Sequence, residues 1–180
     1  MSTEFTNTEQ TQHLGTWVRG GRPVNKVAGT AGYEKVVDQF IEASQALDFS
    51  LVNRHFLAFL PVGGGRVLDA GAGAGQNAAA LAKRGYSVVA VEPMPAFLNA
   101  ARLAYEDLGV VWIEDSLPLL EKLGATIGQF DFVLVQAVWH HLDEAEREQG
   151  MARLAALLDD GGAGAISLRH GPAGAGKHVF

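Results

Sequence analysis

The sequence predicts an α/β protein with a doubly wound, mainly parallel sheet of about five strands and helices on both faces. Two observations carry this prediction. From residue 66 onward, short apolar runs alternate with longer segments whose apolar residues recur at helical spacing. Glycine or proline stands at most of the boundaries between them, which is typical of strand–helix connections. Strands that alternate with helices form right-handed crossovers, and these crossovers place the strands parallel in one sheet.

The part of the chain before this region divides in two. Residues 1–32 are polar and glycine-rich with little periodicity, so we expect either a flexible N-terminal segment or a lid over a site. Apolar residues then recur at helical spacing over 33–47 and again over 51–60, which predicts two helices as an N-terminal extension over 33–62. Pro61 and the glycines after it end the second helix.

The predicted core covers 66–170 of a single domain, 33–180. Short, mostly apolar runs predict five strands, at 66–70, 87–92, 110–115, 130–138 and 163–170. Helical spacing and start signals predict four helices between them, at 76–84, 95–108, 116–122 and 143–158. Pro95 suits a first helical turn, and Asp143 is the expected N-cap of the last helix.

Composition excludes several classes of function. The chain has 180 residues with 48% hydrophobic and 19% charged residues, which is ordinary for one globular domain. Its net charge of −6 disfavours a nucleic-acid partner, because phosphates attract a basic face. The absence of cysteine excludes disulfides and thiolate zinc sites. The sequence lacks both a secretory signal and an apolar run of about 20 residues, so we expect no membrane contact and a cytoplasmic protein.

Three alternate glycines follow the first predicted strand in the segment VLDAGAGAGQ, residues 67–76. Gly71, Gly73 and Gly75 lie where a parallel sheet binds its ligands, beyond the carboxyl end of a strand. Glycine permits a sharp turn and lets a ligand touch the main chain without an intervening Cβ. The alternative is a tight strand–helix turn without a ligand, which would need fewer glycines.

Acidic residues end the next two predicted strands. Glu92 follows Gly75 by 17 residues and could accept hydrogen bonds from both hydroxyls of a ribose; otherwise it is a solvated strand end. Asp115 could accept from an adenine amino group, or it could cap the next helix together with Ser116. Met94 and Leu117 could flank an adenine ring or belong to the core. This arrangement predicts a ligand of the adenosine type.

The glycine pattern disfavours a dinucleotide. The dinucleotide fingerprint needs a third glycine at the position that Gln76 occupies, and the phosphate-binding P-loop pattern is absent. Asp69 precedes the glycines, where a carboxylate would repel a pyrophosphate and attract a cationic ligand.

At these residues the sequence resembles the class I S-adenosylmethionine-dependent methyltransferases. VLDAGAGAG, VVAVEP, IEDSLP, FDFVLVQAVWHHL and LLDDGGAGAISLRHG look like five of their motifs, in order and at family spacing, over roughly residues 50–170. The resemblance implies that S-adenosyl-L-methionine lies against the glycine turn, with Glu92 at the ribose, Asp115 at the adenine amine and Asp69 orienting the loop or the amino group. The implied cofactor site consists of Asp69, Gly71, Ala72, Gly73, Gly75, Glu92, Pro93, Met94, Asp115, Ser116, Leu117, Gln136, Ala137 and Val138.

The resemblance also implies a reaction, methyl transfer to a small-molecule acceptor. His140 and His141 come directly after the fourth predicted strand, so they are candidates for a proton-accepting base; capping or ring packing is the alternative. Without further placed ligands these histidines and Asp143 do not indicate a metal.

The family normally continues beyond the fifth strand with a helix and an antiparallel strand pair, which this chain lacks. We therefore expect a shortened form, or a partner or second copy that covers the fifth-strand edge. Two other functions stay open: a domain that binds the cofactor but is catalytically incomplete or partner-dependent, and a nicotinamide oxidoreductase.

Overall fold

A single five-stranded sheet forms the centre of the computed structural model, which describes residues 27–124 and 129–169. The strands are β1 (Arg66–Ala70), β2 (Ser87–Val91), β3 (Val111–Ile113), β4 (Phe130–Val135) and β5 (Leu158–Ile166). Their order across the sheet is β3-β2-β1-β4-β5, and every neighbouring pair is parallel. The predicted α/β fold is therefore confirmed.

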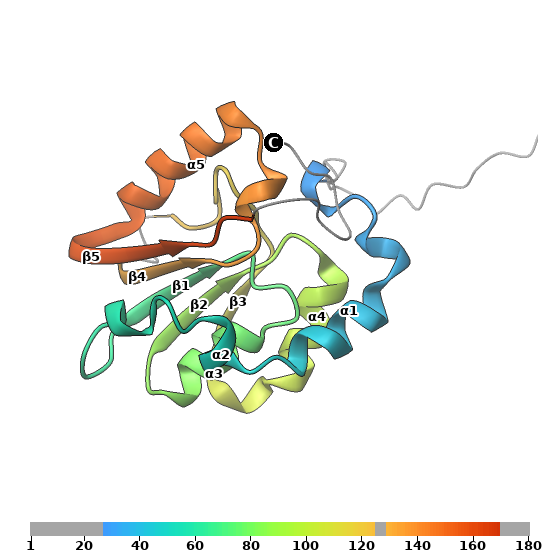
Figure 1. Ribbon diagram of the computed structural model, residues 1–180, viewed down its shortest axis with the longest axis horizontal. Helices are drawn as coiled ribbons and strands as arrows, with labels where there is room; N and C mark the ends of the chain where they lie inside the picture. The colour runs from blue at the N-terminus through green and yellow to red at the C-terminus, as the bar shows by residue number, and fades with distance from the viewer. Residues whose placement is uncertain (1–26, 125–128, 170–180) are drawn as a thin grey trace, which may run out of the picture.

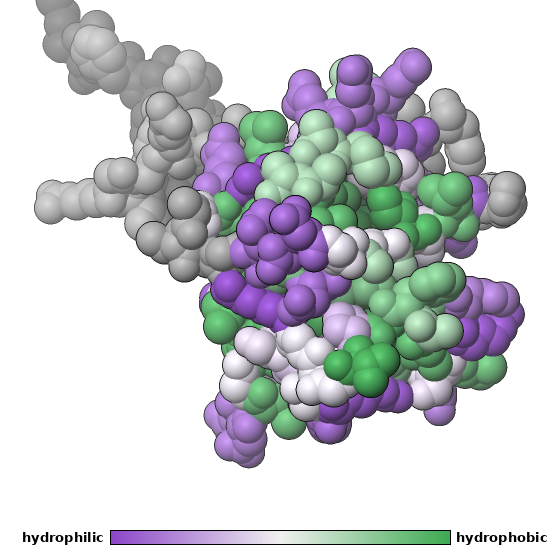
Figure 2. All heavy atoms as spheres, turned by 90° about the vertical axis from the view of Figure 1, so that its left-hand side faces the viewer, coloured by the Kyte–Doolittle hydropathy of each residue, from purple (hydrophilic) through white to green (hydrophobic). Residues whose placement is uncertain are grey.

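The strand order reverses between β1 and β4. β2 and β3 follow β1 on one side of it, and the chain then passes to the other side of β1, where it forms β4 and β5. In open parallel sheets such a switch point leaves a crevice beyond the carboxyl ends of the strands. Residues 27–36 and the helix that follows them, α1, lie beyond these carboxyl ends (Figure 1). At the opposite end of the sheet, hydrophilic and hydrophobic residues are intermingled on the surface (Figure 2).

Helices cover both faces of the sheet (Figure 1). They are α1 (Val37–Gln45), α2 (Phe49–Val52), α3 (Gln76–Lys83), α4 (Pro95–Ala104) and α5 (Glu144–Leu157). Short 3-10 turns lie at Ala28–Thr30, Tyr33–Lys35, Leu57–Phe59, Glu106–Leu108 and Trp139–His141. As predicted, Pro95 begins α4, and Asp143 caps α5 in a capping box with Glu146.

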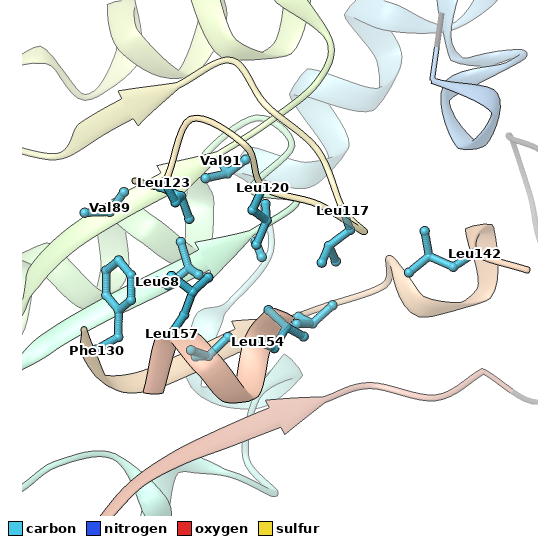
Figure 3. Close-up of a cluster of buried hydrophobic side chains, with 13 residues drawn as sticks. Leu68, Val89, Val91, Leu117, Leu120, Leu123, Phe130, Leu142, Leu154 and Leu157 are labelled. Atoms are coloured by element: carbon cyan, nitrogen blue, oxygen red, sulfur yellow. The ribbon is translucent and has the colours of Figure 1, made fainter. Parts of the chain in front are cut away.

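Two apolar clusters hold the helices to the sheet, because successive strand residues point to opposite faces. On one face, Leu154 and Leu157 of α5 point toward Leu68 and Phe130 of the strands (Figure 3). On the other face, α2 and α3 bury their apolar side chains against β1, β2 and β4. That second cluster contains Phe49, Val67, Ala72, Ala78, Leu81, Val88, Ala90, Phe132 and Leu134.

The helix predicted over 116–122 is wrong, since this segment forms turns. The Asp115 carboxylate accepts hydrogen bonds from the backbone N–H of Ser116 at 2.8 Å and of Lys122 at 2.6 Å, which folds the segment back on itself. Leu120 has a φ of 47°, outside the right-handed helical region. Its side chain is fully buried in the cluster of Figure 3.

Several other predicted boundaries are wrong. The elements β3, β4, α4 and β5 end earlier than predicted, at Ile113, Val135, Ala104 and Ile166, and two further differences have a visible cause. The helix predicted over 51–60 begins earlier and breaks at Asn53, which is buried and donates a hydrogen bond to the Asn77 side chain at 2.9 Å. The fifth strand begins at Leu158 rather than residue 163, because Leu158 already pairs with Phe130. An irregularity then shifts the register, so that Phe132 pairs with Ala163.

Two features are absent from the residues that the structure describes. In 27–124 and 129–169, no helix has both the length and the apolar character that a membrane crossing requires. The same residues contain no group of three or more histidine, aspartate or glutamate side chains that could hold a metal ion.

Candidate functional site

A pocket of about 260 Å³ opens beyond the carboxyl ends of β1 to β4, at the switch point of the sheet. Loops after these four strands form one side of it, and residues from 27–52, which include α1, form the other. Most of the predicted cofactor residues line this pocket: Gly71, Ala72, Gly73, Glu92, Pro93, Met94, Ser116, Leu117, Gln136, Ala137 and Val138. Asp69, Gly75 and Asp115 do not line it.

The three glycines of the first loop all have left-handed backbone angles, with φ of 88°, 54° and 86° at Gly71, Gly73 and Gly75. A Cβ on Gly71 would lie 2.3 Å from a methyl group of Val138, and a Cβ on Gly75 would lie 2.6 Å from the Trp112 ring. Packing within the protein therefore explains these two glycines. Gly73 differs, because the nearest atom to its Cβ would be in the Phe40 ring at 3.5 Å, an ordinary contact distance.

The amides of this loop are hydrogen-bonded within the protein. Gly71 and Ala72 both donate to the carbonyl oxygen of Val91, and Gly75 donates to that of Ala72. The N–H of Gly73 donates to the carboxylate of Glu92 at 2.9 Å. A phosphate site needs several N–H groups that point at the ligand, and these four are directed elsewhere.

Glu92 lies at the carboxyl end of β2 with 5% of its surface exposed, and it lines the pocket. One carboxylate oxygen accepts from Gly73 N–H and the other from Met94 N–H at 2.8 Å. A carboxylate has about four lone-pair positions, so about two remain for a ligand. Glu92 is therefore held in place by the protein and can still accept two further hydrogen bonds.

Asp69 lies behind the glycine loop and is completely buried. Neither of its carboxylate oxygens has a partner with hydrogen-bond geometry in the described part of the chain. Burial raises the pKa of Asp69 to about 7, and the nearby charge of Glu92 contributes to this rise. Burial also raises the pKa of Glu92 to about 7, against the lowering effect of its two backbone hydrogen bonds. Glu92 in the pocket wall and Asp69 behind the glycine loop thus form an acidic pair.

These raised pKa values predict how stability depends on pH. From about pH 4 to pH 7 the folded chain keeps protons on these carboxyls that the unfolded chain releases. The contribution of each carboxyl to the free energy of unfolding therefore falls as pH rises through this window. We expect Asp69→Asn to lose less of its free energy of unfolding than the parent as pH rises from about 4 to 7. Urea unfolding of both proteins at several pH values measures this difference. Equal slopes for the two proteins would contradict the raised pKa of Asp69.

Asp115 is occupied by its own loop. Both of its carboxylate oxygens accept backbone N–H groups, from Ser116 and Lys122, and the residue lies outside the pocket lining. Its neighbours Ser116 and Leu117 do line the pocket. The structure thus gives Asp115 the role of shaping the loop that brings these neighbours to the site.

The two candidate histidines have different positions. His141 lines the pocket, and its Nε2 atom lies 3.4 Å from the hydroxyl oxygen of Tyr33. His140 does not line the pocket; its ring lies against that of His141, with a centroid distance of 4.0 Å. Only His141 is therefore placed to meet a bound substrate.

Sequence reasoning missed the aromatic wall of the pocket. Tyr33, Phe40 and Phe97 pack ring against ring, with centroid distances of 4.6–5.8 Å, and all three line the pocket. Tyr33 and Phe40 are seven residues apart, and this helical spacing predicts that they share one apolar face. The spacing does not indicate that this face covers a pocket. Residues 27–30, predicted as flexible or as a lid, contribute Val27, Gly29 and Thr30 to the lining. The rest of that predicted segment, residues 1–26, lies outside the described residues.

Comparison with known proteins agrees with this geometry. A family model described as a methyltransferase domain matches residues 67–162, a little over half of the chain. An uncharacterized methyltransferase of Mycobacterium tuberculosis (strain ATCC 25618 / H37Rv) is 35% identical over 96 residues, which make up 53% of this chain and 37% of the relative. A ubiquinone biosynthesis O-methyltransferase of Methylocella silvestris is 36% identical over 101 residues, covering 51% of this chain and 39% of that one. The chain therefore matches less than half the length of these relatives.

Solved structures of methyltransferases share the fold. The glycopeptide N-methyltransferase MtfA in complex with S-adenosyl-L-methionine superposes with a TM-score of 0.55 at 23% identity, covering 65% of this chain and 53% of that one. A TehB-like S-adenosylmethionine-dependent methyltransferase from Corynebacterium glutamicum gives a TM-score of 0.55 at 23% identity, covering 74% and 71%. The chain belongs to the methyltransferase domain family and has the fold of the class I S-adenosylmethionine-dependent methyltransferases.

Proposed function

We propose that this chain transfers the methyl group of S-adenosyl-L-methionine to a small-molecule acceptor. The observation that carries the proposal is the Glu92 carboxylate, which lines the pocket and keeps about two lone-pair positions for a ligand. Two vicinal ribose hydroxyls are the matching donors. The names of the relatives and the fold support the same reaction class.

The residues of the pocket fit S-adenosylmethionine better than a dinucleotide. The loop amides of Gly71, Ala72, Gly73 and Gly75 are used within the protein, so they are not arranged to hold a pyrophosphate. The acidic pair of Asp69 and Glu92 favours a cationic ligand such as a sulfonium with an ammonium group. Met94 and Leu117 supply apolar surface for an adenine ring.

When bound, the cofactor supplies a methyl group that its positively charged sulfur activates toward nucleophiles. The protein's part is then to bind, orient and exclude water, which lowers the entropic cost of bringing the reactants together. In this proposal Glu92 fixes the ribose, and Gly73 lets the ligand approach the main chain. Gln136, Ala137 and Val138 border the methionyl part, and His141 faces the acceptor.

Calorimetric titration with S-adenosylhomocysteine and with NAD tests the cofactor. We expect S-adenosylhomocysteine to bind and NAD to bind far more weakly, because the loop has no phosphate-directed amides. NAD binding more tightly than S-adenosylhomocysteine would overturn the proposal. Transfer of a labelled methyl group to a metabolite pool then separates an active enzyme from a domain that only binds the cofactor.

A further inference from the structure

Tyr33 and His141 form a pair on the side of the pocket that the proposed cofactor contacts leave open. Tyr33 lies in the 3-10 turn Tyr33–Lys35 before α1, and His141 lies in the turn after β4, yet the Tyr33 hydroxyl and His141 Nε2 are 3.4 Å apart. Both residues line the pocket. Catalytic hydrogen bonds are often long before substrate binds, so this distance suits a pair that shortens in the complex.

The position of this pair is fixed by packing. The Tyr33 ring meets Phe40, Phe97 and His141 edge to face, with centroid distances of 5.1, 5.8 and 5.9 Å. On the other side of His141, Gly29 packs so closely that a Cβ there would lie 2.8 Å from the histidine Cβ. Packing by Gly29, Phe40 and Phe97 therefore holds both rings in one orientation toward the pocket.

The lining around the pair disfavours a charged acceptor. None of the described lining residues is lysine or arginine, so a carboxylate or phosphate finds no cationic partner among them. The acids of the lining are Glu92 and Glu146, and both already accept backbone N–H groups: Glu92 from Gly73 and Met94, and Glu146 from Asp143. The proposed function assigns Glu92 to the ribose, and Glu146 caps α5, so no carboxylate of the described lining is dedicated to an ammonium group on the acceptor.

Tyr33 is suited to pass on a proton rather than to hold a charge. Burial raises the pKa of Tyr33, the charge of Glu92 raises it further, and exposed Arg169 lowers it. Tyr33 is therefore a neutral phenol at physiological pH, with a proton that it can donate to the imidazole. A phenolic acceptor, with an ordinary pKa near 10, is close enough in acidity to exchange a proton with it.

We propose that Tyr33 and His141 form the acceptor subsite of this enzyme, which takes an uncharged phenol and accepts its hydroxyl proton. This inference rests on the proposed methyl transfer. The acceptor O–H proton moves to the Tyr33 oxygen while the Tyr33 proton moves to His141 Nε2. The acceptor oxygen forms a bond to the methyl carbon, and the methyl–sulfur bond breaks with its electron pair left on sulfur. Tyr33 and His141 are thus catalytic residues.

The test measures transfer of a labelled methyl group from S-adenosylmethionine to phenol, catechol and hydroquinone, with benzoate and benzylamine as charged counterparts of similar size. We expect product from at least one of the three phenols and little from the charged compounds. S-adenosylhomocysteine binding without methylation of any phenol, or preferred methylation of benzylamine, would overturn this inference and leave the proposed function standing. Failure to bind S-adenosylhomocysteine would overturn the proposed function itself.

The variants Tyr33→Phe and His141→Gln test the pair. Each should lower kcat by about 100-fold or more, the usual contribution of general acid–base catalysis, with S-adenosylhomocysteine affinity within about twofold. The matched controls are Tyr105→Phe and His55→Gln, which lie outside the pocket and should leave kcat unchanged. The deficit of Tyr33→Phe should shrink by about tenfold per pH unit as the phenol ionises by itself. A deficit that stays constant with pH would show a merely structural role and overturn the relay.

Discussion

Glu92→Ala should lower the affinity for S-adenosylhomocysteine by about 30- to 1000-fold. The substitution removes a carboxylate that lines the pocket and that we propose accepts two ribose hydroxyls. Hydrogen bonds to a charged group contribute about 1.5–3 kcal/mol each, and replacement by water reduces the sum to about 2–4 kcal/mol. Titration calorimetry of both proteins measures the difference.

The structure adds a second consequence of this substitution. Glu92 also accepts the N–H groups of Gly73 and Met94, so alanine leaves two loop amides without their partner. Glu92→Gln keeps one acceptor oxygen but turns its NH₂ group toward one of these N–H donors. We therefore expect glutamine to give an intermediate loss of affinity rather than parent-like binding.

Glu106→Ala is the control for Glu92→Ala, because Glu106 is exposed and lies outside the pocket. Its effect on affinity should stay below about twofold, as for most surface substitutions. All proteins should be titrated well below their melting temperatures, so that loss of folded protein is not counted as loss of affinity. Parent-like binding by Glu92→Ala would mean that the ribose lies elsewhere.

The strands and the switch point could be predicted because their signals are local. β1 has the predicted bounds, Arg66–Ala70, since an apolar run that ends in an acid and a glycine loop leaves few alternatives. The position of Glu92 at the pocket follows from the same reasoning, because parallel strands bring their carboxyl ends to one edge. One local motif per strand was enough to place most of the loops that line the pocket.

Features that depend on long-range contacts could not be predicted. The 116–122 segment looks helical, but Asp115 closes it into a loop, and Leu120 adopts its left-handed angle while fully buried. Asn53 ends a predicted helix because it bonds to Asn77, 24 residues away. The Tyr33–His141 pair joins residues 108 positions apart. No short sequence window contains both partners of the Asn53–Asn77 or Tyr33–His141 contact. Asp115 acts on its own neighbourhood, where apolar spacing alone predicts a helix.

The need for glycine at Gly75 also comes from residues distant in the sequence, and comparison with Gly85 shows this. Gly75 and Gly85 have nearly the same left-handed φ, 86° and 90°. A Cβ on Gly75 would lie 2.6 Å from the Trp112 ring and 2.8 Å from the Ala101 Cβ, which cannot rotate away. A Cβ on Gly85 would meet no atom within 4 Å. Alanine at the two positions therefore carries the same backbone strain but differs in packing.

Gly75→Ala should lower the free energy of unfolding by about 1–3 kcal/mol more than Gly85→Ala, the usual cost of forcing an extra group into a packed core. Gly85→Ala itself should lose about 1–2 kcal/mol, from the left-handed conformation alone. Urea unfolding of the two variants and the parent measures both values. Equal losses at Gly75 and Gly85 would mean that α3 shifts freely away from Trp112 and Ala101.

Gly73→Val completes the series, because Gly73 is the loop glycine whose Cβ would enter the pocket without a close protein contact. The branched side chain would occupy space next to the proposed ligand, so binding of S-adenosylhomocysteine should be abolished. The fold should survive at a cost of about 1–2 kcal/mol or more from the left-handed backbone of Gly73, since the nearest neighbour is the Phe40 ring at 3.5 Å from the Cβ position. The series thus separates two reasons for one motif: Gly75 is required by the fold and Gly73 by the ligand. If a folded Gly73→Val protein bound S-adenosylhomocysteine like the parent, the three glycines would be required only for the turn and its packing.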